Sequence, residues 1–88
     1  SKESEMMVLG CMLTSLTSLK VASEALEECN FYFTEHKVIF RSLKNAYKDD
    51  RVTDVHIIAE DLKRQNQLQT VGGVIYLTTL AQFAGTSA

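Results

Sequence analysis

Two cysteines and two histidines are the first candidates in this sequence for nucleophilic catalysis or zinc binding: Cys11, Cys29, His36 and His56. Cys29 and His36 are close in sequence, and a thiol beside an imidazole can act as an activated nucleophile. His36 falls on the apolar side of a predicted helix, however, and the sequence suggests neither an orienting carboxylate nor oxyanion donors. We therefore predict no catalytic residues. A small thiol enzyme built on Cys29 and His36 stays an alternative, which a lowered pKa of Cys29 would support.

Metal and phosphate sites have equally little sequence support. A zinc site from the same four residues would need ligands from separate helices, because no C-x-x-C or H-x-x-x-H spacing is present. The glycines form neither G-x-x-x-x-G-K-[ST] nor G-x-G-x-x-G. Gly72 and Gly73 precede a predicted helix and could present backbone amides to an anion, but close packing is the simpler interpretation. We predict no metal site and no cofactor site in these residues.

An aromatic stretch, NFYFTEHKVIF at residues 30–40, raises the question of nucleic-acid binding. Rings interleaved with cations on one surface are typical of single-stranded nucleic-acid binders. Thr34 as a helix N-cap predicts a helix to about Lys48. Helical periodicity then places one set of residues on the core side: His36, Ile39, Phe40, Leu43, Ala46 and Tyr47. It places another set on the opposite side: Lys37, Arg41, Lys44 and Lys48.

This second set, the basic stripe, has more than one interpretation. A stripe of cations is most simply a solvated helix face, and it could also bind an acidic partner or phosphates. A free-standing helical DNA-binding module that uses the basic stripe therefore remains an alternative. The rings themselves are predicted to lie in the core, with Phe31 and Tyr32 folded over the start of the helix.

The remaining segments predict an all-α fold in a single domain, residues 1–88, arranged as a compact orthogonal bundle of about five to six helices. Apolar residues recur at spacings of three and four, and proline is absent. The expected helices cover about Glu3–Leu13 with Ser1 or Ser4 as cap, Leu19–Glu28, Thr34–Lys48, a segment from Thr53 or Asp54 to Asn66, and a segment from Gly72 onward. In the second of these, Val21, Ala22, Ala25 and Leu26 are predicted to share the inner side.

Composition narrows the function classes further. The 88 residues are 45% hydrophobic with a net charge of −2, so binding of duplex DNA over the whole surface is not expected. No stretch approaches the roughly 20 apolar residues of a membrane span, and two unpatterned cysteines suggest reduced thiols in a soluble, cytoplasmic protein.

Gly10 lies within the first predicted helix and predicts a close contact with another helix. Ile57 and Ile75 lie off the core stripes and are candidate contacts with another chain, as is the basic stripe.

Four motifs in order resemble the N-terminal domain of DnaB-type replicative DNA helicases of bacteria, phages and plasmids. They are E-x-x-V-L-G-x-x-L at residues 5–13, F-Y-x-x-x-H-x-x-I-F at 31–40, D-x-x-x-[IL]-A-E-x-L at 54–62 and L-x-x-V-G-G-x-x-Y-L at 68–77. Met7, Asn30 and Gly85 depart from the family pattern, which is typically small, Asp and Pro at these positions. The resemblance implies the globular part of that domain, without the helical hairpin that continues it.

The resemblance also implies a role for these residues in protein contacts. In that family the ATP and Mg²⁺ site and the DNA-translocating loops belong to a RecA-like motor domain of the parent. The N-terminal domains associate with one another, as dimers or as a hexameric collar, and receive primase and the helicase loader. The helicase-binding domain of a primase has a similar helical architecture and is therefore a second assignment.

Overall fold

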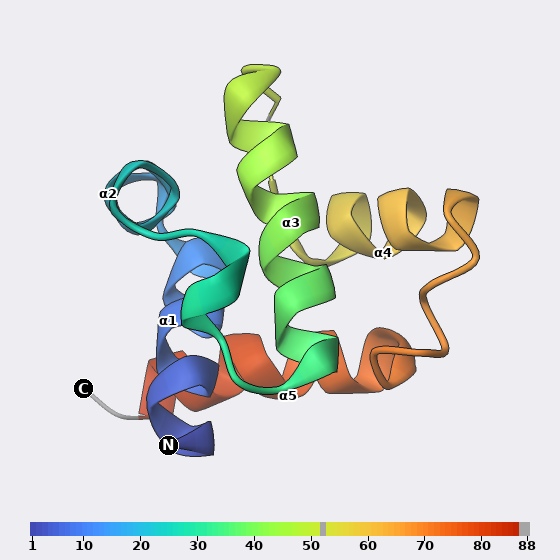
Figure 1. Cartoon of the computed structure of the whole chain (residues 1–88). Helices are drawn as coiled ribbons and strands as arrows, with labels where there is room; N and C mark the ends of the chain where they lie inside the picture. The colour runs from blue at the N-terminus through green and yellow to red at the C-terminus, as the bar shows by residue number, and fades with distance from the viewer. Residues whose placement is uncertain (52, 87–88) are drawn as a thin grey trace.

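Five α-helices and one short 3-10 helix make up the computed structural model, which describes residues 1–51 and 53–86 (Figure 1). The helices are α1 (Lys2–Thr14), α2 (Leu16–Ala25), η1 (Glu28–Asn30), α3 (Thr34–Lys48), α4 (Val55–Arg64) and α5 (Gly73–Thr86). These residues form no strand, so the predicted all-α fold is confirmed. The helices surround a single core formed by apolar residues of every α-helix.

Helices α1 and α5 are in backbone contact at Gly10. Ser1 begins α1 as its N-cap, with its Oγ accepting a hydrogen bond from the Ser4 amide at 3.2 Å. Gly10 is buried, and a Cβ atom at this position would lie 2.2 Å from the carbonyl oxygen of Leu80. Because only glycine leaves room for this approach, the predicted close contact at Gly10 is confirmed.

The second helix differs from its prediction in both bounds and buried face. Ser15 caps α2 by accepting a hydrogen bond from the Ser18 amide, so the helix begins three residues before Leu19 and ends at Ala25. Leu19 and Ser23 are buried, whereas Val21 is 60% exposed and Ala25 is exposed. The predicted inner side is therefore confirmed at Ala22 and Leu26, which are partly buried against the core. It was wrong at Val21 and Ala25, because Leu19 is the large apolar residue that sets the stripe, and its neighbours on that face are three, four and seven residues away.

Helix α3 passes through the middle of the bundle, between α1 and α4 (Figure 1). Its predicted bounds are confirmed, although Phe33 and not Thr34 occupies the N-cap position. The predicted core side is confirmed at His36, Ile39, Phe40, Leu43 and Ala46, all fully buried, while Tyr47 is half-buried.

Of the two aromatic residues predicted to cover the start of α3, one lies in the core and the other lies in solvent. Phe31 is buried, with its ring centroid 4.9 Å from that of Phe40. Tyr32 is 82% exposed, so the prediction that it covers the helix start was wrong. The reason is that consecutive residues in this extended segment point to opposite sides, and only Phe31 faces the core.

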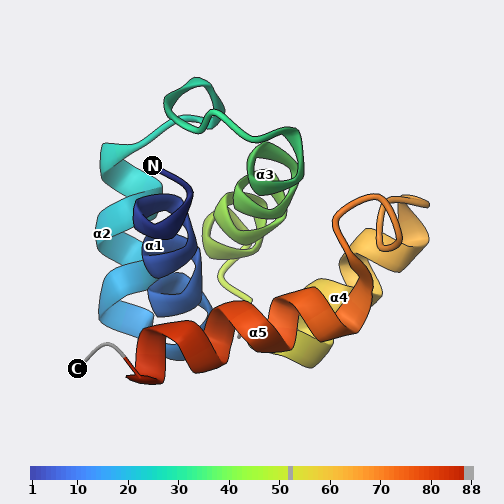
Figure 2. The ribbon, with the colours of Figure 1, turned by 90° about the horizontal axis from the view of Figure 1, so that it is seen from below.

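The last two helices are joined by a tight connection. Asp54, one of the two predicted caps, begins α4 by accepting a hydrogen bond from the Ile57 amide at 2.8 Å. Asn66 adopts a left-handed conformation (φ 58°) after the helix ends. Gly72 and Gly73 also have positive φ, 108° and 73°, which turns the chain directly into α5. Seen from below, α5 runs across the bundle and packs against α1 and α4 (Figure 2).

Candidate partner-binding surfaces

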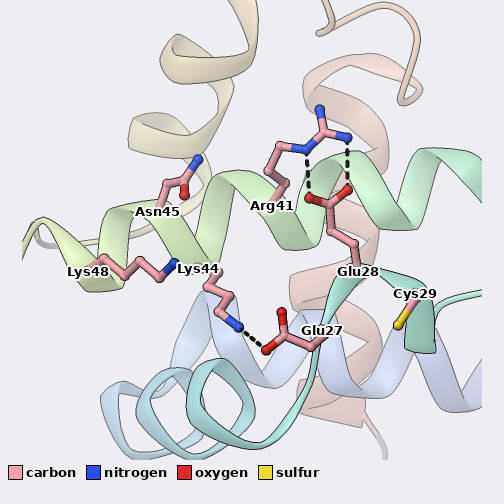
Figure 3. Close-up of a pocket in the computed structure, with 7 residues that line it drawn as sticks. All are labelled: Glu27, Glu28, Cys29, Arg41, Lys44, Asn45 and Lys48. Carbon is pink, nitrogen blue, oxygen red and sulfur yellow. Dashed lines mark hydrogen bonds and ion pairs between the residues drawn. The ribbon is translucent and has the colours of Figure 1, made fainter.

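The basic stripe on α3 is held by two glutamates that precede the helix. Nε and Nη2 of Arg41 donate hydrogen bonds to the Glu28 carboxylate at 2.9 and 2.8 Å. Nζ of Lys44 donates to the carboxylate of Glu27 at 2.7 Å and to the carbonyl oxygen of Leu26 at 3.0 Å (Figure 3). The two central cations of the stripe therefore fix the η1 segment to α3.

The pKa values of the paired side chains shift in the direction that these two ion pairs predict. The hydrogen bond from Arg41 lowers the pKa of Glu28, and Lys37 lowers it further through its charge. The same hydrogen bond raises the pKa of Arg41. Hydrogen bonding and charge attraction from Lys44 lower the pKa of Glu27. Both ion pairs are open to solvent on at least one side, so they contribute little to stability, but they occupy donors that a nucleic-acid phosphate would need.

A cleft of about 410 Å³ lies between η1 and α3 along the basic stripe. Its walls carry charges of both signs, as Figure 3 shows: Glu27, Glu28, Cys29, Arg41, Lys44, Asn45 and Lys48. An anion that entered this cleft would meet two carboxylates as well as three cations. The arrangement suits a partner with mixed charges better than a phosphate backbone.

The aromatic stretch is mainly core, and its rings do not form a platform beside the basic stripe. Phe40 is fully buried while the neighbouring Arg41 is exposed, so the prediction that rings and cations face apart is confirmed for this pair. Lys44 is an exception, because its Nζ lies 5.9 Å from the centroid of the Phe40 ring at the edge of the core. The exposed ring, Tyr32, instead packs edge-on against Phe33.

A polar junction of Glu5, His36 and Tyr76 connects α1, α3 and α5. Nδ1 of the fully buried His36 lies 2.8 Å from the Glu5 carboxylate, and its Nε2 lies 2.6 Å from the Tyr76 hydroxyl. The other oxygen of Glu5 accepts a hydrogen bond from the Tyr32 amide at 2.7 Å, and the Phe33 amide also points to the carboxylate. Glu5 of α1 therefore satisfies free amides that precede α3.

The pKa values of this junction follow from burial and hydrogen bonding. Burial opposes ionisation of Glu5, but the hydrogen bonds from the Tyr32 amide, His36 and the Phe33 amide outweigh it and lower the pKa of Glu5. Burial also raises the pKa of Tyr76, with a further contribution from the charges of Glu35 and Glu5. An ionised carboxylate only accepts hydrogen bonds, so Nδ1 of His36 carries a proton.

The sequence did not reveal this junction, although three of the four family motifs each supply one member. Glu5 is the orienting carboxylate that no local pattern linked to His36, because the two are 31 residues apart. The second ring nitrogen bonds Tyr76 and not Cys29, which is exposed. Both ring nitrogens of His36 are therefore occupied by Glu5 and Tyr76, so the imidazole does not pair with the Cys29 thiol as the thiol-enzyme alternative requires. Within residues 1–51 and 53–86, no three His, Cys, Asp or Glu side chains gather where they could hold a metal ion.

The two isoleucines predicted as partner contacts occupy different environments. Ile57 on α4 is half-buried, whereas Ile75 on α5 is 82% exposed and follows the exposed Val74. Of the basic stripe, Arg41 and Lys48 are exposed and Lys37 and Lys44 are half-buried. No helix in the described part of the chain has the length and apolarity needed to cross a membrane.

The fold and these surfaces define a small all-α domain in which buried polar contacts position the helices. The chain belongs to the DnaB-like helicase N terminal domain family, whose match covers residues 1–88. The resemblance found in the four sequence motifs is thereby confirmed.

Individual relatives agree with this family. The chain is 33% identical to the replicative DNA helicase DnaB of Rhodothermus marinus over 98% of its length, and 33% identical to that of Geobacillus stearothermophilus over its full length. It spans only 9% and 19% of those two proteins. Its structure is similar to the crystal structure of the N-terminal domain of DnaB helicase from Mycobacterium tuberculosis. That comparison gives a TM-score of 0.90 at 29% identity, covering 94% of this chain and 58% of the other.

Proposed function

We propose that this chain is the N-terminal assembly and partner-binding domain of a hexameric, ATP-dependent replicative DNA helicase. Its role is to join subunits into a ring and to receive a primase or helicase loader in the bacterial cytoplasm. The observation that carries the proposal is the match of residues 1–88, end to end, to the N-terminal domain family of these helicases. ATP and Mg²⁺ would bind a motor domain elsewhere in the parent protein.

The interior of the domain supports a role in contacts with other proteins. The groups most suited to chemistry, His36 and Glu5, hydrogen-bond within the junction that positions the helices. Arg41 and Lys44 of the basic stripe pair with glutamates of the same chain. The exposed features include apolar side chains on α2 and α5, among them Leu16 and Ile75, and a cleft of mixed charge, all of which suit protein partners.

The experiment that tests the proposal compares the full-length parent protein with the same protein lacking residues 1–88. Native mass spectrometry should show that the deletion weakens the hexamer, and a pull-down should show loss of primase or loader binding. ATP hydrolysis should persist in the shortened protein, because the motor domain is retained. Unchanged ring assembly together with unchanged primase and loader binding would contradict the proposal.

Assays of primer synthesis, DNA unwinding and oligonucleotide binding on the same two proteins separate the two alternatives. A primase parent would synthesise primers and show no ATP-driven unwinding. A DNA-binding module would lose oligonucleotide binding on deletion while keeping its partners. Because the family match points to the helicase, we expect neither result.

A further inference from the structure

The two outer cations of the basic stripe, Lys37 and Lys48, have no ion-pair partner in the described part of the chain, whereas the two central cations are paired. Asp49 follows Lys48 directly, but its carboxylate lies 3.6 Å from Nη2 of Arg51 instead. The stripe holds four of the nine Lys and Arg residues and pairs with two of the eleven Asp and Glu residues. Positive charge therefore remains at both ends of the stripe, in a chain whose net charge is −2.

The unpaired cations lie on either side of the η1 glutamates. Lys37 and Lys48 are 11 residues apart on the same side of α3, which is about 16 Å along the helix axis. Glu27 and Glu28 pair with the middle of the stripe, and their side chains are still 70% and 40% exposed. A partner that approaches this surface therefore meets positive, negative and positive charge in that order.

We propose that the basic stripe and η1 together bind a peptide segment of a partner protein that has acidic residues at both ends and basic residues between them. The acidic residues pair with Lys37 and Lys48, and the basic residues pair with the exposed sides of Glu27 and Glu28. The cleft of about 410 Å³ receives the middle of the segment, where Asn45 offers a side-chain amide (Figure 3). The inference rests on the proposed function, because it names the chemistry of the partner that the domain receives.

The order of charges favours a peptide over a nucleic acid. A strand of duplex DNA has a phosphate about every 3.4 Å, so about four phosphates would lie between two that contact Lys37 and Lys48. Those inner phosphates would lie over Glu27 and Glu28, which repel them. A wholly acidic peptide would meet the same repulsion. A peptide with charges of both signs can place an opposite charge at each of the four positions, which gives specificity more than affinity.

Two synthetic peptides of the same composition test this contact. Each is an alanine-based helix of about 20 residues with capped ends. The probe has two glutamates with the spacing of Lys37 and Lys48 and two lysines between them on the same face, and in the control peptide lysines and glutamates exchange places. Amide NMR shifts of the labelled 88-residue chain should show saturable binding of the probe near about 1 mM, with the shifts in η1 and α3. Equal binding of both peptides would overturn the proposal.

Substitution of the outer cations tests their part in the contact. Lys37→Ala with Lys48→Ala should weaken binding of the probe by about threefold or more, because both end pairs are lost. Lys20→Ala with Lys63→Ala is the matched control, since it removes the same charge from exposed positions on α2 and α4. It should change the dissociation constant by less than about twofold, because charges outside the contact are screened. Equal weakening by the two double variants would contradict the assigned site.

Substitution of the η1 glutamates distinguishes a peptide site from a nucleic-acid site. Glu27→Gln with Glu28→Gln removes the counter-charges of the probe's lysines, so the probe should bind about threefold or more weaker. A labelled single strand should bind the same variant more tightly, because two repelling carboxylates are gone. A gain in affinity for the probe would overturn the proposed order of charges and favour a purely anionic ligand.

A chain that binds neither peptide would also overturn the inference, and it would leave the proposed function intact. Ring assembly and primase or loader binding are measured separately, on the full-length parent with and without residues 1–88.

Discussion

Nδ1 of His36 and Oε1 of Glu5 lie 2.8 Å apart, with the imidazole fully buried and the carboxylate only 12% exposed. This contact fixes α1 against the beginning of α3, and the Tyr76 hydroxyl on Nε2 extends it to α5. A neutral His36 accepts a hydrogen bond from the Tyr76 O–H, whereas a protonated His36 donates to the same oxygen, because a phenol can do both. The junction therefore satisfies the imidazole in either charge state.

Replacing Glu5 by Gln should destabilise the domain by about 1–3 kcal/mol at pH 7, because charge-assisted hydrogen bonds to the Tyr32 amide and His36 are lost. The pKa of Glu5 is lower in the folded chain than its ordinary value of 4.5. Its contribution is therefore complete above that value and disappears as the pH falls through the folded pKa. Urea unfolding of both proteins should show their difference shrinking on acidification.

The matched control for this substitution is Glu3→Gln, which changes an exposed carboxylate in the same turn of α1. It should alter the free energy of unfolding by less than about 0.5 kcal/mol. Equal effects of the two substitutions at pH 7 would show that the junction contributes nothing specific.

Tyr76→Phe isolates the other end of the junction. The substitution keeps the ring that stacks on His36, with centroids 5.8 Å apart, but leaves a buried Nε2 without its partner. We expect a loss of about 1–3 kcal/mol in the free energy of unfolding. Tyr32→Phe removes a hydroxyl from an 82% exposed ring and should change it by less than about 0.5 kcal/mol. Chemical denaturation of both variants measures the difference, and a neutral Tyr76→Phe would contradict the assigned bond.

Gly10→Ala should lower the melting temperature, although alanine normally stabilises a helix by up to about 1 kcal/mol relative to glycine. The added Cβ would lie 2.2 Å from the Leu80 carbonyl oxygen and 2.9 Å from the Ala84 Cβ, so α1 and α5 must separate. The cost of such overpacking is about 1–3 kcal/mol. Gly85→Ala, where the added methyl group meets open space, is the control and should be neutral or stabilising. Thermal unfolding with a higher melting temperature for Gly10→Ala would refute the close contact.

Local patterns predicted most of the fold and little of the polar site. The inner face of α3 and the caps at Ser1 and Asp54 follow from residues within one or two turns of each other. The face of α2 was predicted incorrectly at Val21 and Ala25, because a short helix fixes its rotation through packing, which in this case follows Leu19. The partners of Arg41 and His36 are 13 and 31 residues away, so only the tertiary structure brings them together.

Oligonucleotide binding by the 88-residue chain most directly tests the claim that this domain acts through protein contacts. We expect the fluorescence anisotropy of a labelled single strand to show no saturation up to about 100 µM protein, weaker than ordinary non-specific DNA binding. Glu27→Gln with Glu28→Gln should increase binding, because it frees Lys44 and Arg41 from their carboxylate partners. Saturable, salt-sensitive binding by the unaltered chain that is lost on Arg41→Glu with Lys44→Glu would contradict the account.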